Sequence, residues 1–94
     1  MRFIELLQSA SEWHDDDTTI YVAQPWSCDT DAVIIKPAPD TTEPVERGET
    51  SFSYFLETVI ARDFLEDYVA SERGTSATER ERCERLIRYA EDDA

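Results

Sequence analysis

SFSYFLETVIARDFLEDYVA, residues 51–70, is the most apolar and aromatic stretch of the chain and decides the fold. Apolar and aromatic residues alternate with other side chains in its first part, as in a β-strand, at Phe52, Tyr54 and Leu56. In its second part they recur every four residues, as on one face of an α-helix, at Ile60, Phe64 and Tyr68. The stretch therefore predicts a strand that passes into a helix, with Thr58 as the cap of that helix. A single helix from Ser53 is the alternative.

The segments before this stretch predict one helix and two more strands. Apolar residues follow the helical spacing of three and four near the start of the chain, at Phe3, Ile4, Leu7 and Ala10. β-Branched and aromatic residues dominate Thr18 to Ala23 and Ala32 to Lys36, which is typical of strands. Residues 37–50 contain three prolines, a glycine and no apolar period, so they predict a loop.

The segment after this stretch predicts a last helix. Two overlapping capping boxes mark its start, Ser76 to Glu79 and Thr78 to Glu81, and Gly74 is a stop signal for the helix before it. One apolar stripe runs along this last helix, at Cys83, Leu86, Ile87 and Ala90. Together the segments predict one α+β domain over residues 1–94, with a helix, a three-stranded antiparallel sheet and two further helices packed on one sheet face.

The charge balance restricts the partners of the chain. Lys36 and eight arginines offset 22 acidic side chains, which gives a formal net charge of −13. A net charge of about 2 to 8 in magnitude is enough to keep a small domain dissolved. The surplus destabilises the folded state by self-repulsion, unless salt or a basic partner screens it. Nucleic acid and anionic membranes should repel the chain, whereas a basic protein should capture it.

The cysteines and the first residues bear on the cellular location. Cys28 and Cys83, the only cysteines, have no spacing typical of a disulfide framework or a zinc site, so free thiols are expected. The first thirteen residues are amphipathic rather than uniformly apolar, which is not the pattern of a signal peptide or a membrane span. These features predict a reducing, cytoplasmic location.

Sites of chemistry have weak support in the sequence. His14 is the only histidine, and a small enzyme or metal-binding module using His14, Asp15 and Cys28 would need these residues to meet in space. The acidic runs lack the spacing and the sixth-position glycine of a calcium loop. Gly48 and Gly74 are the only glycines, so a glycine-rich phosphate-binding loop is absent. We therefore expect no catalytic residue, no metal and no cofactor, and a protein that is not an enzyme.

The distribution of acidic residues is more informative than any motif. Residues 1–70 carry fifteen acidic and four basic side chains, a net of −11, whereas residues 71–94 carry seven and five, a net of −2. In the last helix, Glu81 with Arg85 and Glu84 with Arg88 are spaced for pairing along the helix. The residues expected to bind a partner are one apolar anchor and eight carboxylates elsewhere: Trp26, Asp29, Asp31, Glu43, Glu46, Glu49, Asp63, Glu66 and Asp67.

The spacing of these acids suggests the kind of partner. Acids two apart on an extended chain lie about 6.6 Å apart, and acids four apart on a helix about 6 Å. These intervals are similar to the phosphate spacing of a nucleic-acid strand, so such a surface suits a groove whose arginines normally hold phosphate. The sequence therefore predicts a non-enzymatic acidic inhibitor that occludes a basic nucleic-acid-handling protein. A plain acidic accessory domain of a salt-adapted organism is the alternative.

Two segments carry a resemblance: YFLETVIARDFLEDY, Tyr54 to Tyr68, and CERLIRYAEDDA, Cys83 to Ala94. They resemble small acidic bacterial single-domain proteins that are similar to toxin-immunity or phage-encoded inhibitor proteins. These residues are mostly core and helix surface, so the resemblance implies a shared fold and carries over no site residue. For function, the expected partner is a nuclease toxin, with the chain as its immunity protein, or a CRISPR effector, with the chain as an anti-CRISPR nucleic-acid mimic.

Overall fold

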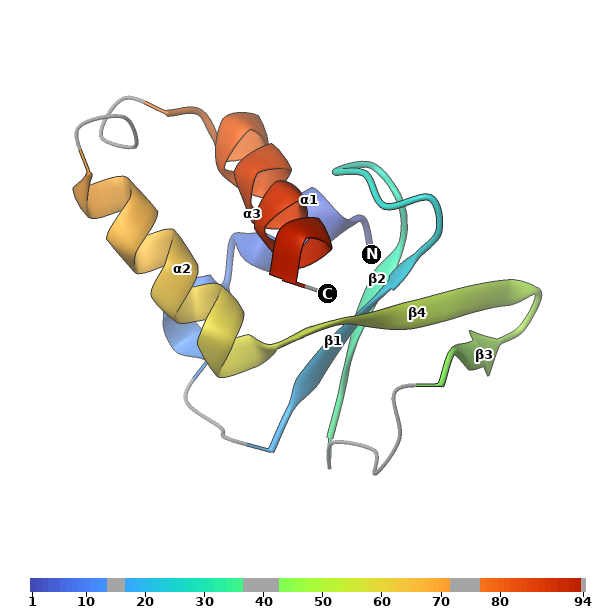
Figure 1. Cartoon of the computed structure of the whole chain (residues 1–94). Coiled ribbons are helices and arrows are strands. Elements are labelled where there is room, and N and C mark those ends of the chain that lie inside the picture. Colours follow the sequence, from blue (N-terminus) through green and yellow to red (C-terminus); the bar gives the residue numbers. More distant parts are fainter. Residues whose placement is uncertain (14–16, 37–42, 72–76, 94) are drawn as a thin grey trace.

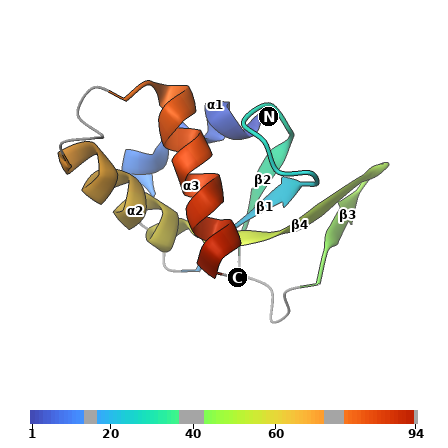
Figure 2. The same cartoon turned by 45° about the horizontal axis from the view of Figure 1, so that its top comes forward.

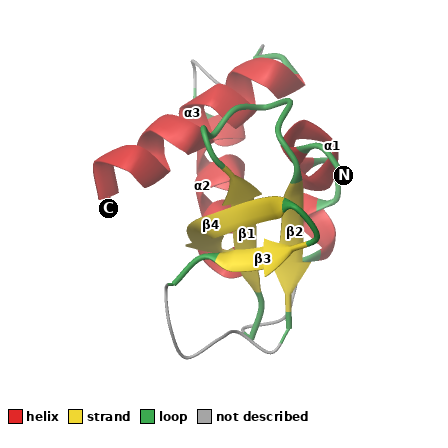
Figure 3. Cartoon of the chain, turned by 90° about the vertical axis from the view of Figure 1, so that its right-hand side faces the viewer, coloured by secondary structure: helices red, strands yellow, loops and turns green. Residues whose placement is uncertain are grey.

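The computed structural model describes residues 1–13, 17–36, 43–71 and 77–93. Along the chain the elements are α1 (Phe3–Leu7), the short 3₁₀ helix η1 (Ala10–Glu12), β1 (Thr19–Ala23), β2 (Ala32–Ile35), β3 (Val45–Arg47), β4 (Thr50–Glu57), α2 (Thr58–Ala70) and α3 (Glu79–Asp93). The α-helices lie to one side of a curled antiparallel sheet, as Figures 1 and 3 show. The predicted α+β class is confirmed.

The long strand β4 passes directly into α2, as the sequence predicts. Glu57 is still extended, with φ −67° and ψ 146°, and the helix begins at the next residue. Thr58 therefore does not cap α2. Its side chain is buried, and its hydroxyl pairs with the hydroxyl of Thr18, just before β1. The predicted threonine cap is wrong because this hydroxyl joins the helix start to the sheet instead.

The sheet has an irregularity that fills the core. In the described residues its strand order is β2–β1–β4–β3, and neighbouring strands are antiparallel. The register of β1 on β4 shifts between the pair Ile20–Leu56 and the pair Tyr21–Tyr54. Phe55 is the extra residue of this bulge, and a bulge changes the direction of neighbouring side chains. As a result the consecutive residues Phe55 and Leu56 both enter the core.

The sequence predicts three strands, and this number is wrong. β3 lies within residues 37–50, where a loop is predicted. It pairs with β4 from Val45 opposite Phe52 to Arg47 opposite Thr50, around a turn in which Gly48 has φ +63°. Three residues of an edge strand with one apolar side chain are too few to show an alternating pattern. Formation of β3 therefore depends on its partner β4 more than on its own sequence.

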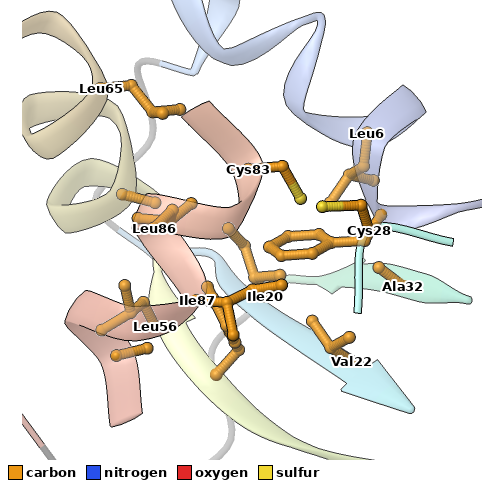
Figure 4. Packing of buried hydrophobic residues seen from close by; sticks show 14 of the residues in the cluster. Leu6, Ile20, Val22, Cys28, Ala32, Leu56, Leu65, Cys83, Leu86 and Ile87 are labelled. Carbon is orange, nitrogen blue, oxygen red and sulfur yellow. The ribbon is translucent and has the colours of Figure 1, made fainter. Parts of the chain in front are cut away.

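One hydrophobic core fills the space between the sheet and the helices (Figure 4). Its buried side chains from the helices include Phe3, Leu6, Ala61, Leu65 and the predicted stripe of α3, Cys83, Leu86, Ile87 and Ala90. The predicted capping box at Thr78 is also confirmed, because the backbone N–H of Glu81 donates to its hydroxyl at 3.1 Å. The other start signal, Ser76, and the stop signal, Gly74, lie outside the described residues.

Candidate binding surfaces

The nine residues predicted to bind a partner do not form one surface. They fall into three groups: Glu43, Glu46 and Glu49 at the β3–β4 hairpin, Asp63, Glu66 and Asp67 on α2, and Trp26, Asp29 and Asp31 in the connection between β1 and β2. Figures 1 and 2 show α2 and the hairpin at opposite ends of the molecule. The predicted residues are therefore spread over the length of the molecule and not gathered at one end.

The hairpin surface consists of Glu46 in β3 and Glu49 in the turn, both of which are exposed. Neither carboxylate forms an ion pair or a hydrogen bond with any residue that the structure describes. Glu46 lies opposite Ser51, which has no charge to offer. In Figure 2 the hairpin projects away from the helices. These carboxylates are therefore open to a partner, and exposed Glu43 precedes them in the chain.

The predicted acids of α2 are all exposed, but they are not equivalent. The Asp63 carboxylate accepts a hydrogen bond from Nη2 of Arg62 at 3.2 Å. Arg62 also donates from Nη1 to the carbonyl oxygen of Trp13 at 2.5 Å, so it links α2 to the end of η1. Glu66 and Asp67 form no ion pair with the described residues. The α2 surface therefore has two unpaired carboxylates, Glu66 and Asp67.

In the β1–β2 connection, Asp29 is already paired with arginines of the same chain. Its two carboxylate oxygens accept hydrogen bonds from Arg80 of α3 at 3.0 and 3.1 Å, and Arg2 lies 3.5 Å away. The hydrogen bonds from Arg80 hold the pKa of Asp29 below its ordinary value of 3.8. The same pairing raises the pKa of Arg80. Asp29 therefore attaches the connection to α3, whereas exposed Asp31 lies 3.9 Å from the amino group of Met1.

Trp26, the predicted apolar anchor, first serves the fold. Its ring packs edge-to-face on Phe55, with ring centroids 4.9 Å apart, and its indole N–H donates to the hydroxyl of Ser53 at 2.9 Å. The side chain is half-buried, and it lines an open pocket of about 490 Å³ with Gln24, Pro25 and Glu91. A partner could therefore reach Trp26 at this pocket, while the rest of its contacts serve the fold.

The ion pairs predicted within α3 do not form in the described chain. Neither Glu81 with Arg85 nor Glu84 with Arg88 lies within ion-pair distance. The Arg85 guanidinium lies over the ring of Tyr68 instead, 5.9 Å from its centroid, a cation–π arrangement. The Glu81 carboxylate accepts from the Thr78 hydroxyl at 3.3 Å. The contact of Glu81 with Thr78 belongs to the predicted capping box, whereas the regular spacing does not predict the contact of Arg85 with Tyr68.

Two structural features have no signal in the sequence. A groove of about 150 Å³ between the helices is lined by Ile4, Leu7, Gln8, Leu65, Glu79 and Arg82. The Nε of Arg82 is buried and has no hydrogen-bond partner among the residues that the structure describes. The side chains of Cys28 and Cys83 are both buried in the same hydrophobic cluster, and their sulfur atoms point toward each other (Figure 4). Both features bring together residues that are more than fifty positions apart, which no local motif predicts.

The alternative of a small enzyme or metal-binding module needs His14, Asp15 and Cys28. His14 and Asp15 lie outside the described residues, and Cys28 is 3% exposed. Within the described ranges, no three histidine, cysteine, aspartate or glutamate residues are grouped so that they could hold a metal ion. The described residues therefore give no support to an enzyme or metal-binding module at His14, Asp15 and Cys28.

Comparison of the chain with known protein families, with curated proteins and with solved structures gives no match. The resemblance to small immunity and inhibitor proteins therefore stays a prediction. Among the described helices, none combines the length and the apolar character that crossing a bilayer requires.

Proposed function

We propose that the protein is a non-enzymatic acidic inhibitor that binds a basic nucleic-acid-handling protein through its β3–β4 hairpin. The observation that supports this best is that Glu46 and Glu49 are exposed and unpaired on a projecting hairpin. Arg47 is the one basic residue between Val45 and Glu57. The arginines that pair with carboxylates in the described chain, Arg2, Arg62 and Arg80, belong to other segments.

The inhibitor would act by charge and by occlusion. Arginines that hold phosphate bind carboxylates with the same forked geometry, so a cationic groove accepts the hairpin in place of a nucleic-acid strand. The formal net charge of −13 would speed the encounter with a basic protein at low ionic strength. The partner is a nuclease toxin or a CRISPR effector, met in the cytoplasm.

Two variants with the same change in charge test this proposal. Glu46→Lys with Glu49→Lys alters the hairpin surface, and Glu66→Lys with Asp67→Lys alters the α2 surface. The immobilised wild-type chain at low salt should retain a basic protein from extracts of the source cell. Added salt or a DNA or RNA oligonucleotide should release that protein, because both compete for its cationic groove. The hairpin variant should lose most of the retention, and the α2 variant should keep it.

The outcomes separate local recognition from bulk charge. Equal losses in the two variants would show that only net charge matters. Full retention by the hairpin variant at low salt would exclude the hairpin as the interface.

A second candidate, a plain acidic accessory domain of a salt-adapted organism, is favoured by one observation. Unpaired carboxylates occur at both ends of the molecule, on α2 as well as on the hairpin. Acidic residues that only keep a protein hydrated and dispersed are expected over its whole surface and not at one face. This candidate expects a free energy of unfolding that rises strongly from low to molar salt, and no retained basic partner.

A further inference from the structure

The two cysteines of the chain meet in the core. Cys28 lies in the β1–β2 connection and Cys83 in α3, and they are 3% and 0% exposed. Figure 4 shows their sulfur atoms directed toward each other. The Cys28 thiol donates a hydrogen bond to the carbonyl oxygen of Arg80 at 3.8 Å, three residues before Cys83 in α3. The two sulfur atoms are thus neighbours in space although they lie 55 positions apart in the sequence.

The backbone on both sides of this contact is fixed. The Cys28 carbonyl oxygen accepts from the N–H of Ile4 at 2.9 Å, and the Thr30 carbonyl oxygen accepts from the N–H of Phe3 at 2.8 Å. Cys83 lies inside a helix of fifteen residues. The ion pair of Asp29 with Arg80 joins the same two segments one residue from Cys28 and three from Cys83. The alignment of the sulfurs is therefore a property of the fold and not of two mobile side chains.

We propose that Cys28 and Cys83 form a site of reversible oxidation, at which a low-molecular-weight disulfide converts the two thiols into a disulfide bond between the β1–β2 connection and α3. A disulfide requires Cβ atoms about 3.5–4.5 Å apart and sulfurs able to approach to about 2 Å. Two thiols whose sulfur atoms already point toward each other need only small side-chain rotations to reach this geometry. The inference is independent of the proposed inhibitor function, because it involves no residue of the hairpin.

The surroundings assign an order to the two sulfurs. Cys28 lines a surface pocket of about 280 Å³, with Trp26, Ser27, Arg80, Glu84 and Ile87, and Cys83 does not. Arg80 lines the same pocket and brings a positive charge to its wall. Burial raises the pKa of the Cys83 thiol. Cys28 is therefore the sulfur that meets the oxidant first.

The exchange then proceeds in two balanced steps. Cys28 gives its proton to solvent, and its thiolate attacks one sulfur of the oxidant, whose S–S bond breaks. The first small thiolate leaves with that electron pair and takes up a proton. Cys83 next gives up its proton, attacks the Cys28 sulfur of the mixed disulfide and expels the second small thiolate, which is also protonated. Two protein thiols are oxidised, and one small disulfide is reduced to two thiols.

Oxidised glutathione is the probe that tests this site. The whole wild-type chain should lose about 2 Da, keep its monomer mass and lose both titratable thiols, and dithiothreitol should reverse these changes. Its Tm should rise by about 10 °C, because a bond that closes a long loop restricts the unfolded chain. Cys83→Ser should stop at the mixed disulfide and gain about 305 Da. Cys28→Ser should react about tenfold more slowly than Cys83→Ser.

Three results would overturn the proposal: covalent dimers, a wild-type glutathione adduct that never resolves, or two free thiols after the same exposure. Because serine in this core could prevent folding, Cys28→Ala and Cys83→Ala provide a second pair of variants, checked by circular dichroism. If no variant folds, the mass and the thiol count of the wild-type chain alone decide whether an intramolecular disulfide has formed.

Discussion

The β1–β2 connection and the β3–β4 hairpin contrast in how they are held. Residues 24–31 have no regular structure, yet they are fixed on three sides: by the N–H groups of Phe3 and Ile4, by Arg80 of α3 and by Trp26 against Phe55. The hairpin is regular, but β3 pairs only with β4. Regular secondary structure is therefore a poor measure of how firmly a segment is attached to this fold.

The same contrast separates two uses of acidic residues. Asp29 in the connection faces two arginines of its own chain, whereas Glu46 and Glu49 in the hairpin pair with no arginine that the structure describes. An acid that pairs within the chain is partly neutralised before any partner arrives. An acid without such a pair adds only repulsion to the folded state, so its contribution to stability is near zero or negative. We infer that the unpaired acids are the ones available for recognition.

The largest expected effect comes from removing the aromatic anchor of the connection. Trp26→Ala should lower the free energy of unfolding by about 3 kcal/mol, because it removes the contact with Phe55 and leaves a gap at the core. Val45→Ala in β3 is the corresponding but smaller truncation in the hairpin, and it should cost less than about 1 kcal/mol because the side chain is half-buried at a sheet edge. Urea denaturation of both variants measures the difference, and equal costs would contradict the contrast.

A smaller effect is expected at the turn of the hairpin. Gly48 has φ +63°, and a Cβ added there would meet nothing within 4 Å, so the cost of a side chain is purely conformational. Gly48→Ala should therefore lower the free energy of unfolding by about 1 kcal/mol. Gly48→Asn is the control, and it should cost less because asparagine tolerates the left-handed region. A Gly48→Ala variant as stable as the wild type would mean that the turn can change shape without loss.

These two segments also show how far the sequence predicts the structure. The alternation at Phe52, Tyr54 and Leu56 correctly predicts β4, and the four-residue period after it correctly predicts α2. β3 escapes prediction because pairing with an existing strand, and not an apolar pattern of its own, makes it a strand. The bulge at Phe55 has the same origin, since it depends on how β1 and β4 align.

The candidate sites were less predictable than the fold. Acidic composition correctly indicated which residues are exposed, because charged side chains rarely lie in a core. It did not indicate that Asp29 pairs with Arg80, because these residues are 51 positions apart and meet only through the tertiary fold. Cys28 and Cys83 are likewise distant in the sequence and are brought together only by the tertiary fold. Local spacing predicts what a segment becomes, whereas pairing between distant segments requires the fold.

The next prediction concerns pH. Arg80 lowers the pKa of Asp29 in the folded state, so their pairing contributes stability above the ordinary value of 3.8, and this contribution is lost as the pH falls through the lower folded value. Asp29→Asn should therefore be less stable than the wild type near neutral pH, and the difference should shrink in acid. Urea denaturation over a pH series measures it. In an Arg80→Gln background the difference should be small at every pH, and its persistence there would assign the effect to another group.

The smallest expected effect is that of charge reversal in the hairpin on stability. Glu46→Lys with Glu49→Lys changes the net charge from −13 to −9 and breaks no ion pair within the described ranges. The free energy of unfolding should therefore change by no more than about 0.5 kcal/mol, toward higher stability. The control is Asp29→Lys with Asp31→Lys, which changes the net charge equally but places a cation beside Arg80 and Arg2. This control should be clearly less stable than the hairpin variant, as urea denaturation measures.

If the hairpin variant is destabilised as much as the control, its acids serve the fold and are not reserved for a partner. If both variants are equally stable, the ion pairs of Asp29 do not help to hold the β1–β2 connection in place. The connection and the hairpin would then not differ in how much their acidic residues contribute to stability.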